Sequence, residues 1–345
     1  MSGAYFSRVA QSTPTEFWIN NATPAQARQA MELGAVGATT NPTYLAKIAP
    51  DDEELLARLD ELIDRDVAPE AAIMEVYQGS VLRLASIFRP LFEASGGRHG
   101  LVAIQGNPRR NDDAEFMIRE GLALAALAEN IIVKVPATPA GAAAMQALVR
   151  ENIPTIATLG FSVAQAVYMA EAYERARAAA GKSPRCYVTY IAGILDEVLA
   201  AEAREQHLPL DEAALRAAGC EGTRIAYEEY RRRGFTARLM GGGARGPHHF
   251  SELAGGDLAI TIGWNLTEAL QHEAPAPRID RHAAAETVAA LRAHLPDFVK
   301  AADPDALSPA EFTRFRPVRE FQASFVKAFD DLERFIAGRK TRQHV

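Results

Sequence analysis

The sequence lacks several features that mark particular classes of protein. Only two of its 345 residues are cysteines, Cys186 and Cys220, and neither stands in a CxxC or Cys/His spacing. The sequence therefore gives no sign of a zinc or dithiol site. Lys and Arg number 37 against 44 Asp and Glu, a formal net charge of −7. Without an excess of positive charge, binding to nucleic acid or to an anionic membrane is not expected.

Long apolar runs are also missing. The chain contains no stretch of about 18 apolar residues, and its first ten residues, MSGAYFSRVA, hold no apolar signal-peptide core. We therefore expect a soluble, cytoplasmic protein. Hydrophobic residues still make up 48% of the chain, which is enough to build a large core.

Eight short apolar or β-branched runs alternate with longer helical stretches, a pattern typical of a parallel sheet built from βα units. Eight strands are the number that closes a (β/α)8 TIM barrel, so we predict an α/β fold of that type. The predicted strands are Glu16–Asn20, Val36–Thr40, Leu101–Gln105, Ile131–Val135, Thr155–Leu159, Tyr187–Ile191, Thr236–Met240 and Leu258–Ile262.

The segments between these strands carry helix start and stop signals. Thr23, Pro24 and Gln26 form a capping-box pattern, and Gly34 can end the same helix in a left-handed conformation. We predict a barrel domain over residues 1–275 and a helical extension over residues 276–345, packed on the outside of the barrel or over one mouth. The predicted helices cover residues 69–88, 113–129, 139–150, 162–179, 193–206 and 221–233, with a further charged helix in DDEELLARLDELIDRD.

Lys134 is the most unusual residue in the predicted strands, because it stands inside the apolar run IIVKVP. Strand alternation places it on the same face as Ile132 and opposite Val133 and Val135. A lysine that loses its hydration has a lowered pKa, and its neutral amine is then a nucleophile. Pro136 follows closely, so Lys134 lies near the carboxyl end of its strand, where barrels place their active sites. The alternative is that Lys134 extends its ammonium group to solvent as a surface charge.

Two segments of the chain resemble the transaldolase family, which includes fructose 6-phosphate aldolase-like enzymes. One is IIVKVPATPAGAAAMQALVRENIPTIATLGFSVAQAVYMAEA, and the other is NNATPAQARQAMELGAVGATTNPTYL with its TTNP turn. The similarity runs from about Glu16 to Leu270, weakens after Ile191, and leaves the last 70 or so residues poorly matched. It implies a class I aldolase that works through a lysine Schiff base, on a (β/α)8 barrel with neither a metal nor an organic cofactor.

The resemblance assigns roles to individual residues. Lys134 falls on the imine-forming lysine, Asn41 on an asparagine that hydrogen-bonds substrate hydroxyls, and Thr158 on a threonine that positions the water used to form and hydrolyse the imine. For Asn41 the alternative is a plain Asn-Pro turn, and for Thr158 it is packing inside a strand. The other predicted substrate-binding residues are Thr40, Ser162, Thr189, Gly243 and Arg245.

Three positions depart from the family's pattern. Asn20 stands where the family has an aspartate that accepts a proton, and an amide cannot do so. Gln105 replaces a glutamate, as in the fructose 6-phosphate aldolase-like branch, where the glutamine can still hold the water. Ile194 stands in place of an arginine that binds the substrate phosphate. The predicted catalytic set is therefore Lys134, Thr158, Gln105 and Asn20.

Other polar residues near the predicted site keep more than one interpretation. Tyr190 could replace the missing base, although a packing role is favoured for it. The loop Gly241–Gly243 could expose N–H groups to a phosphate or could form a simple tight turn. His248 and His249 have no acidic or cysteine partner at a suitable spacing, so we interpret them as loop histidines and predict no metal site.

The leading functional prediction is a transaldolase or aldolase that transfers or releases a dihydroxyacetone unit from a ketose or ketose phosphate, with a modified or non-phosphorylated sugar as one option. One alternative is another imine-forming reaction, such as that of an isomerase or lyase. Another is a sugar-phosphate-binding relative without activity. The expected partner is a small-molecule sugar or sugar phosphate, and homo-oligomer formation is left open.

Overall fold

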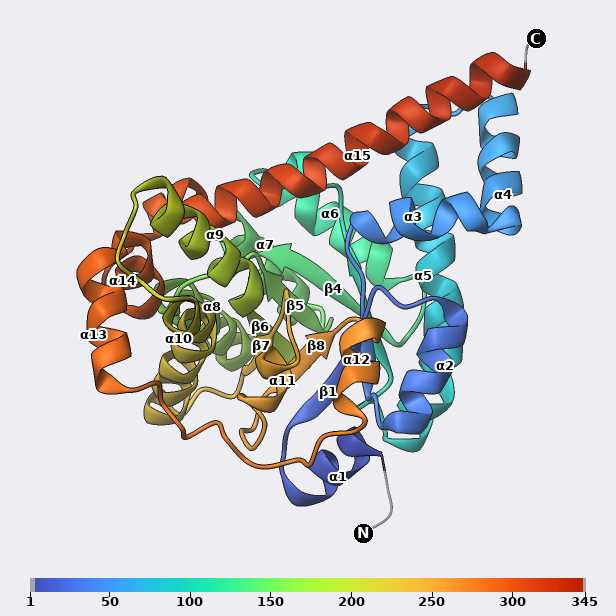
Figure 1. Ribbon diagram of the computed structural model, residues 1–345. Coiled ribbons are helices and arrows are strands. Elements are labelled where there is room, and N and C mark those ends of the chain that lie inside the picture. The colour runs from blue at the N-terminus through green and yellow to red at the C-terminus, as the bar shows by residue number, and fades with distance from the viewer. Residues whose placement is uncertain (1–3, 344–345) are drawn as a thin grey trace.

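A computed structural model describes residues 4–343 as a closed barrel of eight parallel strands surrounded by helices (Figure 1). Each strand pairs with the next along the chain, and the last returns to the first, with Glu16 opposite Ala259. The predicted (β/α)8 fold is confirmed. The strands are β1 (Glu16–Asn20), β2 (Gly37–Thr39), β3 (Leu101–Gln105), β4 (Ile131–Pro136), β5 (Thr155–Thr158), β6 (Cys186–Tyr190), β7 (Arg238–Gly241) and β8 (Ala259–Ile262).

Fifteen α-helices and three short 3₁₀ turns connect or extend these strands within residues 4–343. The helices are α1 (Tyr5–Ser12), α2 (Pro24–Leu33), α3 (Thr43–Ile48), α4 (Glu53–Asp64), α5 (Pro69–Ala94), α6 (Ala114–Ala125), α7 (Pro139–Arg150), α8 (Val163–Ala180), α9 (Ala192–Glu205), α10 (Glu212–Arg233), α11 (His248–Ser251), α12 (Trp264–Leu270), α13 (Ala285–His294), α14 (Pro296–Ala302) and α15 (Arg316–Gln343). The 3₁₀ turns are Ala49–Asp51, Pro108–Arg110 and Pro309–Arg314. No helix among the described residues is both long enough and apolar enough to cross a membrane.

The start of α2 follows the predicted capping box. The side chain of Thr23 accepts a hydrogen bond from the backbone N–H of Gln26, whose own side chain accepts from the backbone N–H of Thr23. Pro24 opens the helix, and Gly34 ends it at φ 112°. These bonds satisfy N–H groups that have no partner within the helix.

Helix α10 begins nine residues earlier than the sequence predicted, at Glu212 instead of residue 221. The helix contains two glycines, Gly219 and Gly222, although glycine lowers helix propensity. The structure explains both by close packing. A Cβ on Gly219 would lie 2.3 Å from the carbonyl oxygen of Ala192, and a Cβ on Gly222 would lie 1.9 Å from the hydroxyl of Tyr190.

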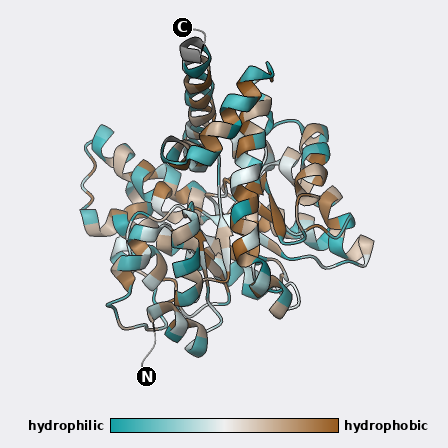
Figure 2. Cartoon of the chain, turned by 90° about the vertical axis from the view of Figure 1, so that its right-hand side faces the viewer, coloured by the Kyte–Doolittle hydropathy of each residue, from teal (hydrophilic) through white to brown (hydrophobic). Residues whose placement is uncertain are grey.

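The core has two layers. One set of buried side chains points into the barrel. A larger set packs between the strands and the surrounding helices. Figure 2 shows hydrophobic residues concentrated along the strands and on the inner sides of the helices. Ile132 belongs to the interior set and Val133 to the outer one, so the predicted strand alternation is correct and Lys134 points into the barrel. The interior set is Trp18, Leu101, Ala103, Ile132, Ile156, Tyr187, Met240 and Ala259.

The C-terminal helices lie in two different places. Helices α13 and α14 pack against α10 on the outside of the barrel, whereas α15 crosses the molecule to reach α4 (Figure 1). Phe321, Ser324 and Phe325 of α15 line the cavity at the carboxyl ends of the strands. Arg109 donates to Glu333 at 2.6 Å, which ties the middle of α15 to the loop after β3.

Candidate active site

A cavity of about 310 Å³ opens at the carboxyl ends of the strands. Seven of the ten residues predicted for the site line this cavity. They come from separate strands and loops that only the closed barrel brings together. These residues are Asn20, Asn41, Lys134, Thr158, Thr189, Gly243 and Arg245.

Lys134 reaches the cavity from β4 and is surrounded by protein on its other sides. Its Nζ donates a hydrogen bond to the backbone carbonyl of Thr40 at 3.0 Å, and no salt bridge to it is present among residues 4–343. Burial lowers the pKa of Lys134 from 10.5 to about 8, because the protein replaces water without supplying a negative charge. Its ammonium form is therefore disfavoured, and a neutral, nucleophilic amine is accessible near neutral pH. The alternative of a lysine extended to solvent as a surface charge is wrong.

Hydroxyl and amide groups surround the lysine. Thr39 donates to the Oδ1 of Asn20 at 3.0 Å, and its hydroxyl lies 2.6 Å from that of Thr261. Thr158 and Thr189 face the same cavity from β5 and β6. Among the residues of 4–343 that line the cavity there is neither an aspartate nor a glutamate. The wall can thus bind hydroxyl groups, but it holds no carboxylate that could accept a proton.

Asn41 is fixed by its neighbours. Its Oδ1 accepts hydrogen bonds from the backbone N–H of Thr43 at 3.0 Å, the Thr43 hydroxyl at 2.6 Å and the Nδ2 of Asn21 at 3.3 Å. Because the backbone N–H of Thr43 can only donate, the Nδ2 of Asn41 must lie on the other side of the amide, where it can donate to a ligand. Asn21 itself takes a positive φ of 47°, a conformation that asparagine tolerates better than most residues.

The solvent end of the cavity is formed by the loop after β7 and by two helices. Arg245 lies there with 44% of its side chain exposed, and its Nε contacts Glu197 at 2.7 Å. Ile191 and Ile194, together with Phe321, add apolar surface. Gly243 has a φ of 64°, and a Cβ on it would lie 2.4 Å from Ile191, so a side chain would not fit. This end therefore offers one cation that already has an anionic partner.

Three of the predicted residues do not place their side chains in the cavity. The hydroxyl of Thr40 lies 2.6 Å from that of Tyr77 and donates to the carbonyl of Ala103, so only the Thr40 carbonyl contacts Lys134. Ser162 is the buried N-cap of α8 and accepts from the backbone N–H of Gln165 at 3.1 Å. Its predicted binding role was a misreading of a helix cap.

Gln105 is the third residue outside the cavity. It pairs with Lys134 across β3 and β4, yet its side chain is 3% exposed and lines a separate small space beside Tyr77 and Phe329. Both polar atoms of its amide are buried without a hydrogen-bond partner in the structure. A buried amide in this state is costly, and the register alone does not bring it to the site.

Sequence reasoning missed several residues that line the cavity. Thr39 and Thr261 alternate correctly with buried neighbours and stand at strand ends, so the strand pattern could have suggested both. Phe321, Ser324 and Phe325 gave no signal, because nothing in the pattern of α15 indicates which part of the barrel it crosses. Tyr190 faces away from the cavity and donates to the carbonyl of Ala301 at 3.2 Å, so it packs outside the barrel as favoured.

The interpretation of His248 and His249 as loop histidines without an acidic partner is wrong. Both lie in the short helix α11, and the carboxylate of Asp196 on α9 lies beside their rings. Asp196 precedes them by about fifty residues, so local spacing could not show the contact. Three potential ligand atoms of these residues lie within 4.8 Å of one another.

Comparisons with known proteins identify the family of the chain. A family model described as Transaldolase/Fructose-6-phosphate aldolase matches residues 17–330. The match extends well past Leu270, where the sequence resemblance was expected to end, and includes much of the C-terminal segment.

Similar curated proteins are transaldolases by name. The chain is 33% identical to "Transaldolase 1" of Streptomyces avermitilis over 56% of its own length and 54% of that relative. It is 33% identical to a "Probable transaldolase" of Aquifex aeolicus over 53% of its length and 62% of that protein. It is also 34% identical to a "Transaldolase" of Mycobacterium ulcerans over 37% and 35%. The chain thus spans about half the length of the curated relatives it matches, while the family model covers most of the chain: it belongs to the Transaldolase/Fructose-6-phosphate aldolase family.

Proposed function

We propose that this chain is a transaldolase-like class I aldolase in which Lys134 forms an imine with a ketose. The observation that carries the proposal is the position of Lys134, which lies inside the barrel at the base of a hydroxyl-lined cavity and has no anionic partner in the described part of the chain. Apart from Arg245 at the solvent end, the other polar side chains that line the cavity are neutral, which suits a polyhydroxylated substrate.

The chemistry follows from the amine. The neutral Nζ of Lys134 adds to the ketose carbonyl, and loss of water gives an imine that is protonated on nitrogen. This cation accepts the electron pair of the adjacent C–C bond as that bond breaks. The hydroxyl proton of the departing carbon passes to solvent water at the open end of the cavity, because no carboxylate among the described lining residues can accept it, and an aldehyde is released. The three-carbon enamine then adds to an acceptor aldehyde or takes a proton, and water hydrolyses the imine to restore the lysine. A dihydroxyacetone unit is thereby transferred or released.

The near end of the cavity supports binding of the dihydroxyacetone part. Asn41 has an amide donor available, and Thr158, Thr189 and Thr261 add hydroxyls at neighbouring strand ends. Hydroxyl groups both donate and accept, so they match sugar hydroxyls without imposing a charge.

The solvent end favours a substrate without phosphate. A phosphate dianion gains most from unpaired arginines in bidentate contact, whereas Arg245 is already paired with Glu197 and Ile194 can form no such bond. We therefore propose that the part of the sugar beyond the broken bond is neutral or carries a group other than phosphate.

A second candidate is another reaction through the same imine, such as an isomerisation or elimination. It is favoured by the absence of an aspartate or glutamate among the described cavity-lining residues, since the amide of Asn20 cannot remove the hydroxyl proton. Product analysis separates the two. Recovery of two carbon fragments from one ketose supports cleavage, and an isomer or dehydrated product supports the second candidate. An inactive relative would give neither.

The test of the imine is borohydride trapping with dihydroxyacetone and with fructose, followed by peptide mass spectrometry. We expect label on Lys134 and its loss in Lys134→Met. Lys47 is an exposed lysine that contacts the carbonyl of Asn21, so Lys47→Met is the matched control and should keep the label. If neither dihydroxyacetone nor fructose labels Lys134, the proposal is refuted.

A further inference from the structure

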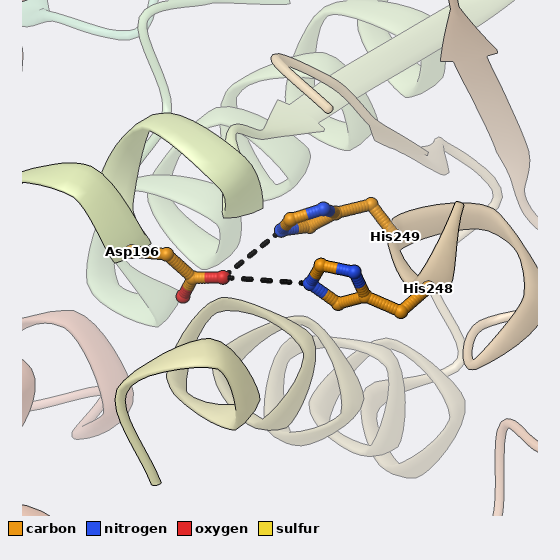
Figure 3. A group of neighbouring side chains, drawn as sticks. All are labelled: Asp196, His248 and His249. Atoms are coloured by element: carbon orange, nitrogen blue, oxygen red, sulfur yellow. Dashed lines mark hydrogen bonds and ion pairs between the residues drawn. The ribbon is translucent and has the colours of Figure 1, made fainter. Parts of the chain in front are cut away.

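Asp196, His248 and His249 form a compact group (Figure 3), and His249 contacts the backbone N–H of Arg245. The Nε2 of His249 lies 3.0 Å from the Oδ2 of Asp196, and the Nε2 of His248 lies 4.0 Å from the same oxygen. The side chain of His249 is 3% exposed and that of His248 is 23% exposed. Two histidines and a carboxylate are common ligands of zinc and related metals.

The hydrogen-bond directions argue against a metal. The Nδ1 of His249 accepts from the backbone N–H of Arg245 at 3.4 Å. The Nδ1 of His248 lies 3.3 Å from a guanidinium nitrogen of Arg216, which can only donate. A neutral imidazole that accepts at Nδ1 carries its proton at Nε2, so both rings present an N–H toward Asp196. A metal bound there would need both Nε2 atoms unprotonated.

The same hydrogen bonds form a continuous chain from the loop after β7 to α9 and α10. The backbone N–H of Arg245 donates to His249, His249 donates to one oxygen of Asp196, and the backbone N–H of Gly219 on α10 donates to the other oxygen at 2.6 Å. Both oxygens of this carboxylate, which is only 11% exposed, are therefore used. The loop after β7 is thus fixed to α9 and, through it, to α10.

These hydrogen bonds lie close to the place where the loop after β7 contacts the first turn of α9. A Cβ on Gly193 would lie 2.5 Å from the carbonyl oxygen of Gly243 and 2.8 Å from the backbone nitrogen of Arg245. The loop and the helix are therefore in direct backbone contact, and a small shift of the loop would move Gly243 and Arg245 at the solvent end of the cavity.

We propose that Asp196 and His249 are positioning residues that hold Gly243 and Arg245 in place and thereby set the affinity for the part of a ketose beyond the imine. The proposal rests on the proposed function, because it assumes that a ketose bound to Lys134 extends toward this loop. Neither residue lines the cavity, so both act through Arg245 and Gly243. His248, whose Nε2 is too far from Asp196 for a hydrogen bond, has no such role.

The first test compares trapping by a short and a long ketone. In His249→Gln and in Asp196→Asn, the concentration of fructose that gives half-maximal borohydride labelling of Lys134 should rise about tenfold. The same concentration for dihydroxyacetone, which is too short to reach the loop, should change less than twofold. Asp196→Asn keeps the shape of the side chain and replaces one acceptor by a donor, so it tests the same connection if His249→Gln does not fold. His248→Gln, one residue away, is the matched control and should leave both values unchanged.

A second measurement needs no ligand. Amide hydrogen exchange in peptides covering Gly242–Gly246 should quicken in His249→Gln and not in His248→Gln, with the melting temperature recorded for each variant. Failure of the wild type to label Lys134 would count against the proposed function, while unchanged exchange and unchanged fructose dependence in both test variants would overturn this inference alone. Stoichiometric zinc in the purified protein, lost equally in His248→Gln and His249→Gln, would also overturn it.

Discussion

Replacing Lys134 by methionine should abolish imine formation and make the folded protein more stable at pH 7. The amine is partly buried at the base of the cavity, has no anionic partner among residues 4–343, and its pKa falls from 10.5 to about 8 because of desolvation. At pH 7 the lysine is therefore mostly protonated in both the folded and the unfolded chain, but the folded chain holds that charge at a cost. Methionine has a similar length and carries no charge.

The magnitude follows from the two pKa values. With a pKa of about 8 in the folded chain against 10.5 in the unfolded one, the charge costs about 3 to 3.5 kcal/mol at pH 7. The variant also loses the hydrogen bond from Nζ to the carbonyl of Thr40, which is worth about 1 kcal/mol. We therefore expect Lys134→Met to raise the free energy of unfolding by about 2 kcal/mol.

The pH dependence provides the decisive comparison. Because the folded pKa lies below the unfolded one, the cost is fully present below pH 8 and disappears as the pH rises toward 10.5. Urea unfolding of both proteins at pH 7 and at pH 10 measures the difference directly. If Lys134→Met is no more stable than the wild type at pH 7, or if its advantage does not shrink at pH 10, then the lysine is not desolvated and the reasoning is wrong.

Three further predictions concern the surroundings of the site. Asn20→Asp would place a carboxylate in the cavity, so the pH at which the trapping rate of Lys134 is half-maximal, expected near pH 8 in the wild type, should move upward; an unchanged profile would contradict this. Burial raises the pKa of Glu120 to about 7, so wild-type stability should fall by about 2 to 3 kcal/mol between about pH 4.5 and pH 7, and Glu120→Gln should remove much of this fall in urea titrations. A Cβ on Gly141 would lie 1.9 Å from the carbonyl oxygen of Pro136, so Gly141→Ala should lower the melting temperature by several degrees, and a melting temperature equal to that of the wild type would show that the end of β4 yields easily.

The parts of the site carried by strands could be predicted from the sequence. Lys134 and Thr158 stand in short apolar runs whose alternation shows which face each residue takes. The closed barrel then makes all inward side chains near the carboxyl ends of the strands neighbours. The alternation of side chains along a strand and the number of strands can both be read from short stretches of sequence, so this part of the site can be predicted without knowing any long-range contact.

The predictions that the structure corrects concern residues whose positions depend on distant contacts or on helix caps. Ser162 follows a strand and looked like a ligand-binding residue, but its hydroxyl caps α8. Asp196 lies about fifty residues from His249 in the sequence, and the two meet only through a side-chain contact between α9 and α11 that the tertiary fold creates. Gln105 has the correct alternation, yet its side chain turns toward Tyr77 instead of the cavity. Neither spacing nor periodicity contains this information.

The two ends of the cavity are built from different elements, so substrate choice can change at one end without affecting the other. The amine and the hydroxyls around it are held by the register of β-strands, where a shift of one residue would turn every side chain to the other face. The solvent end is formed by a glycine-rich loop, the first turn of α9 and the N-terminal part of α15, which contribute Arg245, Ile194 and Phe321. Substitutions in these three segments alter what the distal part of a sugar meets without disturbing the strand that carries Lys134. Under the proposed function, an isoleucine at position 194, where the family resemblance implies an arginine, is therefore compatible with imine formation at Lys134, and a difference in substrate is expected at the end of the cavity farthest from the lysine.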